Sequence, residues 1–275
     1  GKDFIEGLEG VKKLQEYDRT RKLSDTYTNK IIDAYKNSND RMIFLDYDGT
    51  LQGFYKNPQD ARPDAELYKI LDKLTADEKN NVIIISGRDK ETLSSWFNEE
   101  WKIGFIAEHG VWHREIDGNW HMMEPIDKGW MDIIKSTIQF YVDRTPRSFI
   151  EEKNYSLVWH YRNSDPDLGV QRAYELKDEL QSLVANLQLE IMDGDKVIEI
   201  KNAGINKGRA ALNRMGEHKY DFILAMGDDW TDEFTFESMP DDAFTIKVGT
   251  KRTRAKYYVE NYKSIREFLK LLVKF

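Results

Sequence analysis

The chain has 275 residues, of which 40% are hydrophobic, 33% are charged and none is cysteine. This composition supports a sizeable apolar core and excludes disulfides, cysteine nucleophiles and cysteine-ligated metal centres. The 41 basic and 49 acidic side chains give a net charge of −8. A general nucleic-acid binder is therefore excluded, because it needs a basic surface to neutralise phosphates.

The length predicts roughly two domains at ~150 residues each. The longest apolar runs, at 42–45 and 82–85, are far shorter than the ~20 residues that cross a bilayer. The first residues are charged and lack the apolar stretch of a signal peptide. We therefore expect a cytoplasmic protein with no membrane partner.

Apolar residues at spacings of three and four open the chain. Phe4, Leu8 and Val11 follow this spacing, and Ile31 and Tyr35 belong to a second such stretch. The spacing is typical of amphipathic helices and predicts an N-terminal helical segment over residues 1–40.

The pattern then changes to short apolar strands that end in polar loops and are followed by helical stretches. Such strands are predicted at 42–45, 82–85 and 104–107. The same rhythm returns after residue 204, with a helix at 207–216 and strands at 222–226 and 244–248. This alternation predicts a parallel sheet covered on both faces, whose ligands bind at the carboxyl ends of its strands.

An antiparallel pattern interrupts this alternation. Turn signals at Asp117-Gly118 and Asp193-Gly194 each separate two strand-like segments, and helices are predicted near 128–142 and 169–186. We therefore predict an α+β module at 112–202, inserted into a parallel core formed by 41–111 and 203–275.

Two carboxylates follow the first predicted strand, in Asp46-Tyr47-Asp48-Gly49-Thr50. One carboxylate can attack phosphorus, and a second can protonate the leaving alcohol and then activate water. Like charges this close need a cation, and Mg²⁺ prefers carboxylates. An ordinary Asp-Gly turn explains the same residues when they are taken alone.

Three further polar groups follow other strands or begin helices. Ser86 can bind phosphate, although a helix N-cap explains it better in isolation. Lys207 can neutralise phosphate, although most single lysines are solvated surface residues. In the acidic loop, Asp228 is the expected metal ligand, and Asp232 would hold a metal-bound water or orient Lys207; an acidic helix start is the alternative.

The order and strand context of these four groups resemble the haloacid dehalogenase-like (HAD) phosphatase superfamily. The resemblance implies an α/β fold with a Rossmann-like parallel-sheet core and an inserted α+β cap domain of the C2 type. It implies catalytic roles for Asp46, Asp48, Ser86 and Lys207, and a Mg²⁺ cofactor held by Asp46, the backbone carbonyl of Asp48 and Asp228. Supporting roles fall to Gly49, Thr50, Arg88, Asp229 and Asp232.

Residues of the inserted module narrow the resemblance. Glu151-x-Lys153, His160-Tyr161-Arg162, Glu199 eight residues before Lys207, and Glu108-His109-Gly110 are together similar to trehalose-6-phosphate phosphatases. Periodicity alone leaves exposed surface ion pairs equally open for the module's charged residues. The resemblance implies that the sugar is bound by Glu151, Lys153, Arg162, Glu199, His109 and Gly110.

The activity that the resemblance implies is Mg²⁺-dependent hydrolysis of trehalose 6-phosphate through an aspartyl phosphate. The alternatives are a capped phosphatase for sucrose phosphate or a mannosyl phosphoester, a phosphomutase, and a non-catalytic regulatory domain of a trehalose synthase complex. The presence of Asp46, Asp48, Lys207 and Asp228 argues against the last. The expected partners are the sugar phosphate and an upstream or separate trehalose-6-phosphate synthase domain.

Overall fold

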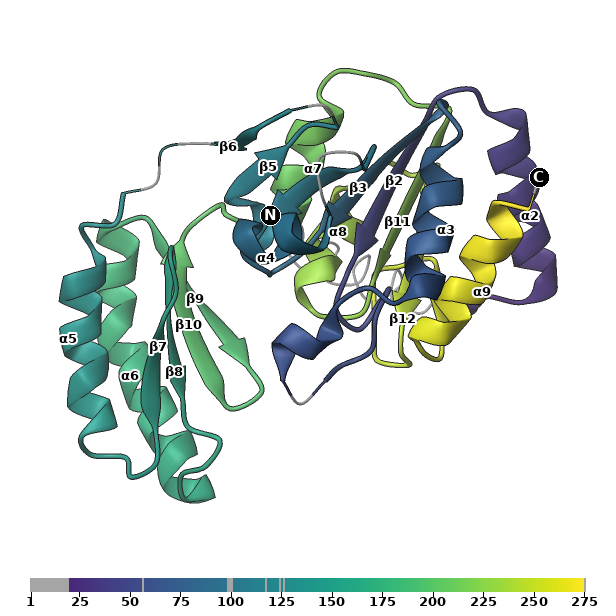
Figure 1. The fold of residues 1–275 in the computed structure, drawn as a ribbon. Helices are drawn as coiled ribbons and strands as arrows, with labels where there is room; N and C mark the ends of the chain where they lie inside the picture. The colour runs from purple at the N-terminus through teal and green to yellow at the C-terminus, as the bar shows by residue number, and fades with distance from the viewer. Residues whose placement is uncertain are drawn as a thin grey trace, which may run out of the picture. The chain divides into compact units, whose positions relative to one another are not determined.

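A computed structural model describes residues 20–55, 57–97, 101–116, 118–123, 125 and 127–274. The helical prediction for the first 19 residues lies outside this part of the chain. The chain divides into two compact units (Figure 1). One comprises Gly1–Met123 and Asn206–Phe275, and the other comprises Glu124–Ile205.

A mixed, mainly parallel sheet forms the centre of the first unit. Among the described residues its strand order is β1-β13-β12-β11-β2-β3-β4-β5-β6. The bounds are β1 (Arg21–Lys22), β2 (Arg41–Asp46), β3 (Asn80–Ile85), β4 (Gly104–Ala107), β5 (Trp112–Arg114), β6 (Trp120–Met122), β11 (Phe222–Gly227), β12 (Phe244–Val248) and β13 (Tyr257–Val259). Strand β2 pairs in parallel with β11 on one side and β3 on the other, so its carboxyl end lies centrally at that edge of the sheet.

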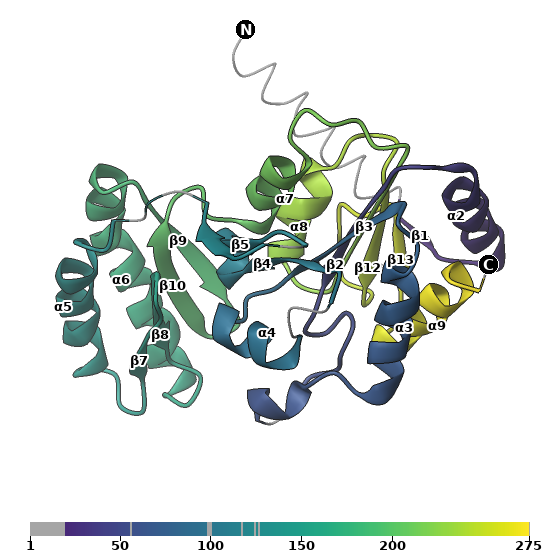
Figure 2. The same cartoon turned by 45° about the horizontal axis from the view of Figure 1, so that its top comes forward.

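Helices cover both faces of this sheet (Figures 1 and 2). Because side chains alternate along a strand, Ile43 and Leu45 of β2 enter one apolar cluster, while Met42 and Phe44 enter another. The first cluster includes α2 (Asp25–Asn37), α3 (Ala65–Thr75), α4 (Lys90–Trp96) and α9 (Tyr262–Leu272). The second includes α7 (Lys207–Met215) and α8 (Thr231–Ser238). Short 3-10 turns η1 (Pro58–Ala61) and η2 (Glu108–Gly110) complete the described elements of this unit.

The second unit packs two helices on one face of an antiparallel sheet. The sheet order is β7 (Phe149–Glu152), β8 (Ser156–His160), β10 (Val197–Asn202) and β9 (Leu189–Gly194). The helices are α5 (Met131–Val142) and α6 (Pro166–Asn186), whose Ile134, Ile138 and Leu176 pack with Trp159 and Ile198 of the sheet. This is the antiparallel α+β arrangement that the sequence pattern predicts.

The unit boundaries differ from those expected from the sequence. Strands β5 and β6 join the first unit instead of opening the inserted module, because Phe105 and Ala107 of β4 pair with Arg114 and Trp112 of β5. Helix α2 also belongs to the first unit, since Ile31 and Tyr35 lie in its core. Residues 20–40 are therefore not a separate segment.

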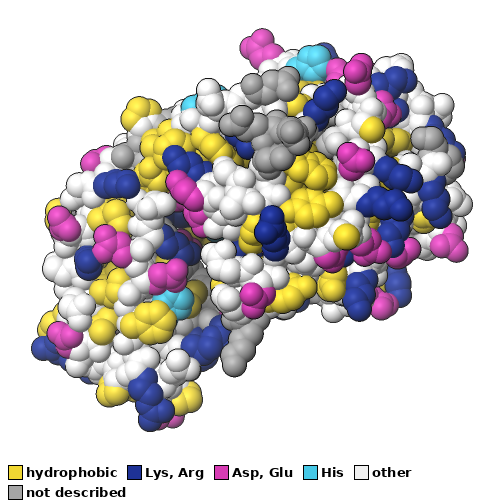
Figure 3. Space-filling model, in the orientation of Figure 1, with side chains coloured by type: hydrophobic (Ala, Val, Ile, Leu, Met, Phe, Trp, Pro, Cys, Tyr) yellow, Lys and Arg dark blue, Asp and Glu magenta, His cyan; other side chains and the backbone are white. Residues whose placement is uncertain are grey.

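The surface mixes charge of both signs. Basic and acidic side chains are interspersed with apolar ones over the face shown in Figure 3, in keeping with a composition that is 33% charged. Within the described ranges, no helix has both the length and the apolar character needed to cross a membrane.

Candidate active site

Asp46 ends the central strand β2 and is only 5% exposed. Its Oδ1 atom accepts a hydrogen bond of 2.6 Å from Nζ of Lys207. Its Oδ2 atom is buried and has no hydrogen-bond partner among the described residues. One oxygen of this carboxylate is therefore fixed by the protein, while the other is left for a ligand.

Lys207 is the first residue of α7 and is 3% exposed. Its Nζ atom lies between two carboxylates, 2.6 Å from Asp46 and 2.8 Å from Asp232. Burial alone would lower the pKa of Lys207, but Asp232 and Asp46 outweigh burial and hold this pKa above its ordinary value. The site therefore contains a fixed positive charge at the end of the central strand.

Asp232 organises the acidic loop after β11 from the first turn of α8. Its Oδ2 atom accepts hydrogen bonds of 3.0 Å from the backbone N–H groups of both Asp228 and Asp229. Its Oδ1 atom accepts the bond from Lys207. Of the two roles that the sequence left open, the orientation of Lys207 is the one that these contacts support.

The carboxylates also form a group suited to a cation. Ligand oxygens of Asp46, Asp228 and Asp232 lie within 4.8 Å of one another. Burial, Asp232 and Asp229 raise the pKa of Asp228 to about 7, and burial and Asp232 raise the pKa of Asp46. A hard divalent cation would offset this repulsion, and the unpaired Oδ2 of Asp46 is a suitable ligand atom. The residues present therefore fit Mg²⁺.

Gly49 allows the loop after β2 to approach Asp228. A Cβ atom at this position would lie 2.1 Å from Oδ2 of Asp228, and the backbone φ is +84°. Only glycine adopts this conformation readily and leaves that space open. Thr50 beside it is fully buried.

Asp48 is held by an arginine in this structure. Its two carboxylate oxygens accept hydrogen bonds of 2.7 and 2.6 Å from Arg88, a bidentate pair. The Arg88 guanidinium also lies over the ring of Trp96, 4.4 Å from its centroid. The structure therefore places the Asp48 side chain with Arg88, apart from the group of three carboxylates.

Ser86 and the Glu108-His109-Gly110 turn meet beside the end of β3. The hydroxyl of Ser86, which is 1% exposed, accepts a bond from the Arg88 N–H, and its carbonyl accepts one from the His109 N–H. A Cβ atom at Gly110 would lie 3.1 Å from the carbonyl oxygen of Asn206, next to Lys207. Ser86 therefore lies beside the Glu108-His109-Gly110 turn, and this turn lies beside Asn206, the residue before Lys207. The three come from different parts of the chain.

Most of the remaining predicted residues share one face of the second unit. Glu151 and Glu199 both lie opposite Val158 of the intervening strand, and this face is the one that the helices do not cover. Glu151 pairs with His160 at 2.7 Å, and Lys153 lies 3.8 Å from Glu199. Arg162 is elsewhere, in the loop after β8, where it pairs with Asp195 at 3.0 Å.

Two features of the first unit were not predicted. Lys247 is buried on β12 and donates a hydrogen bond of 2.9 Å to the carbonyl oxygen of Asp229. This bond holds the acidic loop in place. A lone lysine in the apolar stretch 244–248 was the available signal. A cavity of about 410 Å³ also lies beside Asp228, lined in part by Phe54, which is 77% exposed, and Tyr55.

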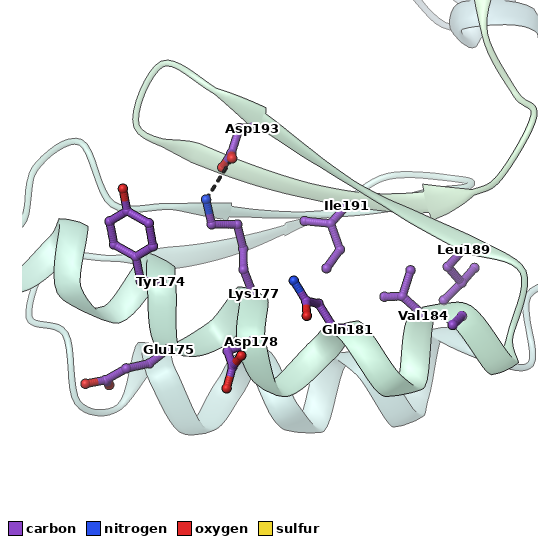
Figure 4. A pocket seen from close by; sticks show the side chains of 10 residues that line it. Tyr174, Glu175, Lys177, Asp178, Gln181, Val184, Leu189, Ile191 and Asp193 are labelled. Atoms are coloured by element: carbon purple, nitrogen blue, oxygen red, sulfur yellow. Dashed lines mark hydrogen bonds and ion pairs between the residues drawn. The ribbon is translucent and has the colours of Figure 1, made fainter. Parts of the chain in front are cut away.

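A larger hollow lies within the second unit and is separate from every predicted residue. It has a volume of about 970 Å³ and lies between α6 and β9, where Tyr174 and Lys177 face Ile191 and Asp193 (Figure 4). Lys177 and Asp193 form an ion pair of 2.7 Å across it. Its carboxylates, on Glu175, Asp178 and Asp193, do not belong to either group of potential metal ligands found among the described residues.

Comparison with known proteins agrees with this geometry. The sequence profile described as trehalose-phosphatase matches residues 44–263. A "Bifunctional trehalose-6-phosphate synthase/phosphatase" of Thermoproteus tenax is 35% identical over 274 residues, which cover 99% of this chain and 37% of that protein. The chain spans about a third of the length of the curated relatives it matches.

Solved structures show the same fold. The C-terminal domain of the trehalose-6-phosphate phosphatase of C. albicans superposes with a TM-score of 0.78 at 32% identity, covering 92% of this chain and 98% of that one. A haloacid dehalogenase-like hydrolase of Bacteroides thetaiotaomicron, at 12% identity, gives a TM-score of 0.61 over 85% of this chain and 99% of that one. The predicted HAD-type α/β fold is thereby confirmed, and the chain belongs to the trehalose-phosphatase family.

Proposed function

We propose that this protein is a Mg²⁺-dependent phosphatase that hydrolyses trehalose 6-phosphate to trehalose and phosphate. One observation carries the proposal: Lys207 bridges Asp46 and Asp232 in a buried site whose carboxylates include Asp228. A buried carboxylate with one free oxygen, a fixed cation and a place for a metal are the parts that phosphoryl transfer to an aspartate requires.

Asp46 is the proposed nucleophile. Its carboxylate forms a bond to phosphorus as the bond from phosphorus to the sugar oxygen breaks, which gives an aspartyl phosphate. Lys207 and Ser86 then stabilise the charge that develops on the phosphoryl oxygens. When bound, Mg²⁺ would be held by Asp46, the backbone carbonyl of Asp48 and Asp228, and would neutralise part of the phosphate charge.

Asp48 is the proposed acid and base. It gives a proton to the departing sugar oxygen, and it then takes one from the water that attacks the aspartyl phosphate. Because both of its oxygens accept hydrogen bonds from Arg88, Asp48 has to leave Arg88 before it reaches the reacting atoms. We therefore propose that Arg88 holds the Asp48 side chain in a conformation that precedes the reaction.

The second unit supplies the proposed sugar contacts. Glu151, Lys153 and Glu199 are charged groups on one uncovered sheet face, and charged groups bind hydroxyls through strong hydrogen bonds. We propose that they bind the disaccharide together with Arg162, His109 and Gly110. We also propose that a trehalose-6-phosphate synthase domain supplies the substrate, as the name of the Thermoproteus relative suggests.

Phosphate release from a panel of esters tests the proposal. The panel holds trehalose 6-phosphate, sucrose 6-phosphate, glucose 6-phosphate and p-nitrophenyl phosphate, each with Mg²⁺ and with EDTA. We expect Mg²⁺-dependent release that is fastest from trehalose 6-phosphate. Preference for another sugar phosphate would overturn the assignment of trehalose 6-phosphate as the substrate. If phosphate is released from none of the esters, the protein is better explained as a regulatory domain.

The variant Asp46→Asn tests the nucleophile. We expect turnover to vanish while the melting temperature at pH 7 without Mg²⁺ stays level or rises. Because the pKa of Asp46 is raised, its ionised form destabilises the folded protein at pH values above the ordinary carboxyl pKa. A neutral asparagine removes this destabilisation. Differential scanning calorimetry measures the second effect. Residual turnover near that of the wild type would rule out Asp46 as the nucleophile.

A further inference from the structure

A second group of potential metal ligands lies on the hairpin formed by β5 and β6. His113 and His121 are directly opposite one another on the two strands, and Glu115 is two residues beyond His113. One ligand atom from each residue lies within 4.8 Å of the other two, and the two imidazole centroids are 4.3 Å apart. His113 and His121, as a directly opposite pair, lie on the same face of the hairpin, and Glu115 follows directly after β5 ends at Arg114.

We propose that this hairpin binds a transition-metal ion of the Zn²⁺ type through His113, His121 and Glu115. Two imidazoles and one carboxylate suit such an ion, whereas Mg²⁺ prefers oxygen ligands alone. The set leaves a fourth position for water. The site is distinct from the group of Asp46, Asp228 and Asp232, because β3 and β4 separate the hairpin from β2 in the sheet order.

The surroundings of His113 support the proposal. Its Nδ1 atom is shielded from solvent and has no hydrogen-bond partner among the described residues. Coordination through this nitrogen would satisfy it.

Glu115 is held in place from outside the hairpin. Arg214 of α7 pairs with its Oε2 atom at 2.5 Å, which leaves Oε1 for a metal. Outer contacts of this kind orient ligating side chains in metal sites. The ion would therefore link β5 to the edge strand β6, which is the last strand of the first unit before residue 124 begins the second.

Metal titration of the whole chain tests the site. Zn²⁺ binding is measured by calorimetry, and Co²⁺ binding by its visible absorption, in excess Mg²⁺ so that the carboxylate site is occupied. The variants are His121→Gln, whose side chain is exposed, and His113→Gln. His218→Gln is the matched control, because His218 pairs with Asp40 away from the hairpin.

We expect the wild type and His218→Gln to bind one more equivalent of Zn²⁺ than His121→Gln or His113→Gln, with a loss of affinity of at least tenfold in both hairpin variants. The Co²⁺ absorption of the wild type should show imidazole coordination and disappear in the same two variants. Phosphatase activity with Mg²⁺ alone should be unchanged in His121→Gln. Equal Zn²⁺ stoichiometry and affinity in all four proteins would overturn the proposal.

Discussion

Gly49 lets the loop after β2 lie close to the acidic loop, because glycine has no side chain. We expect Gly49→Ala to lower kcat at least ~100-fold, because the new methyl group would displace Asp228 and strain a backbone with φ of +84°. The matched control is Gly216→Ala, since φ there is also positive at +58° but nothing lies within 4 Å of the added atom. Steady-state kinetics and thermal unfolding of both variants separate the two effects. Equal loss of activity in both would mean that strain alone matters.

Glu151 and Glu152 are neighbours on β7 that point to opposite faces. Glu151 contacts His160 on the uncovered face, while Glu152 pairs with Lys135 of α5 on the helical side. We expect Glu151→Gln to reduce kcat/KM for trehalose 6-phosphate by ~10-fold or more, since a charged hydrogen bond to the sugar is lost. Glu152→Gln should have no effect, and p-nitrophenyl phosphate should be cleaved equally by both. A loss on both substrates would assign Glu151 a structural role.

Arg266 joins three elements of the first unit at the scale of helices and loops. From α9 it donates to the carbonyl of Leu51 in the loop after β2, and it pairs at 2.7 Å with Asp64 at the start of α3. Asp64 also caps α3 by accepting a bond from the Leu67 N–H. Helix positions and loop position are therefore coupled through one side chain.

The pH dependence of stability should report this junction. Burial acts to raise the pKa of Asp64, but the Leu67 N–H and Arg266 outweigh burial and leave this pKa below 3.8. A lowered carboxyl pKa stabilises the fold above its unfolded value, and the effect is lost as the pH falls through the folded value. Asp64→Asn, which retains a capping side chain, should cost about 1 kcal/mol at pH 6 and less at pH 3.

Urea unfolding at the two pH values measures this difference. Glu267→Gln is the control, because Glu267 is an exposed residue of α9 whose ion pair is with Lys270. If the free energies of unfolding of the wild type and Asp64→Asn differ by the same amount at pH 6 and pH 3, the stabilising role assigned to ionised Asp64 is contradicted.

Elements buried on both faces were the ones that the sequence predicted well. Strands β2 and β3 contain the apolar runs 42–45 and 82–85 beside polar loops, which is typical of strands buried on both faces. Strands β5 and β6 were recognised as a hairpin, but their assignment to the inserted module was not what the structure shows. The pattern of a short hairpin does not say which sheet it will join, because that choice rests on tertiary contacts.

Some features of the candidate site can likewise be predicted from the sequence and others cannot. Asp46, Lys207 and Asp228 follow motifs whose order along the chain is informative, and the structure brings them together. The pairing of Asp48 with Arg88 and the support of Asp229 by Lys247 depend on side-chain positions that no local pattern encodes.

The two segments of the first unit meet where the second unit is inserted. The Met123 N–H donates to the carbonyl of Val111, and the Asn206 carbonyl lies beside the neighbouring Gly110. Because these ends are close, replacing residues 124–205 with a short glycine-serine linker should leave a folded first unit. We expect it to hydrolyse p-nitrophenyl phosphate with Mg²⁺ and to lose preference for trehalose 6-phosphate by ~100-fold or more. Far-UV circular dichroism and the ester panel measure both properties, and retained preference would place sugar recognition in the first unit.

The position of β2 between β3 and β11 has a consequence for how the protein folds. Asp46 and Lys207 are separated by 161 residues. The chain segment between them therefore has to close into a loop before β11 can pair with β2 and complete the central sheet. The second unit, by contrast, is continuous in sequence and needs no partner from outside Glu124–Ile205 to form its core. Contacts of short sequence separation form sooner than distant ones. During refolding, pulse-labelled hydrogen exchange should therefore show protection of β8 and β10 before β2, and Asp46 should be among the last residues to reach its native position.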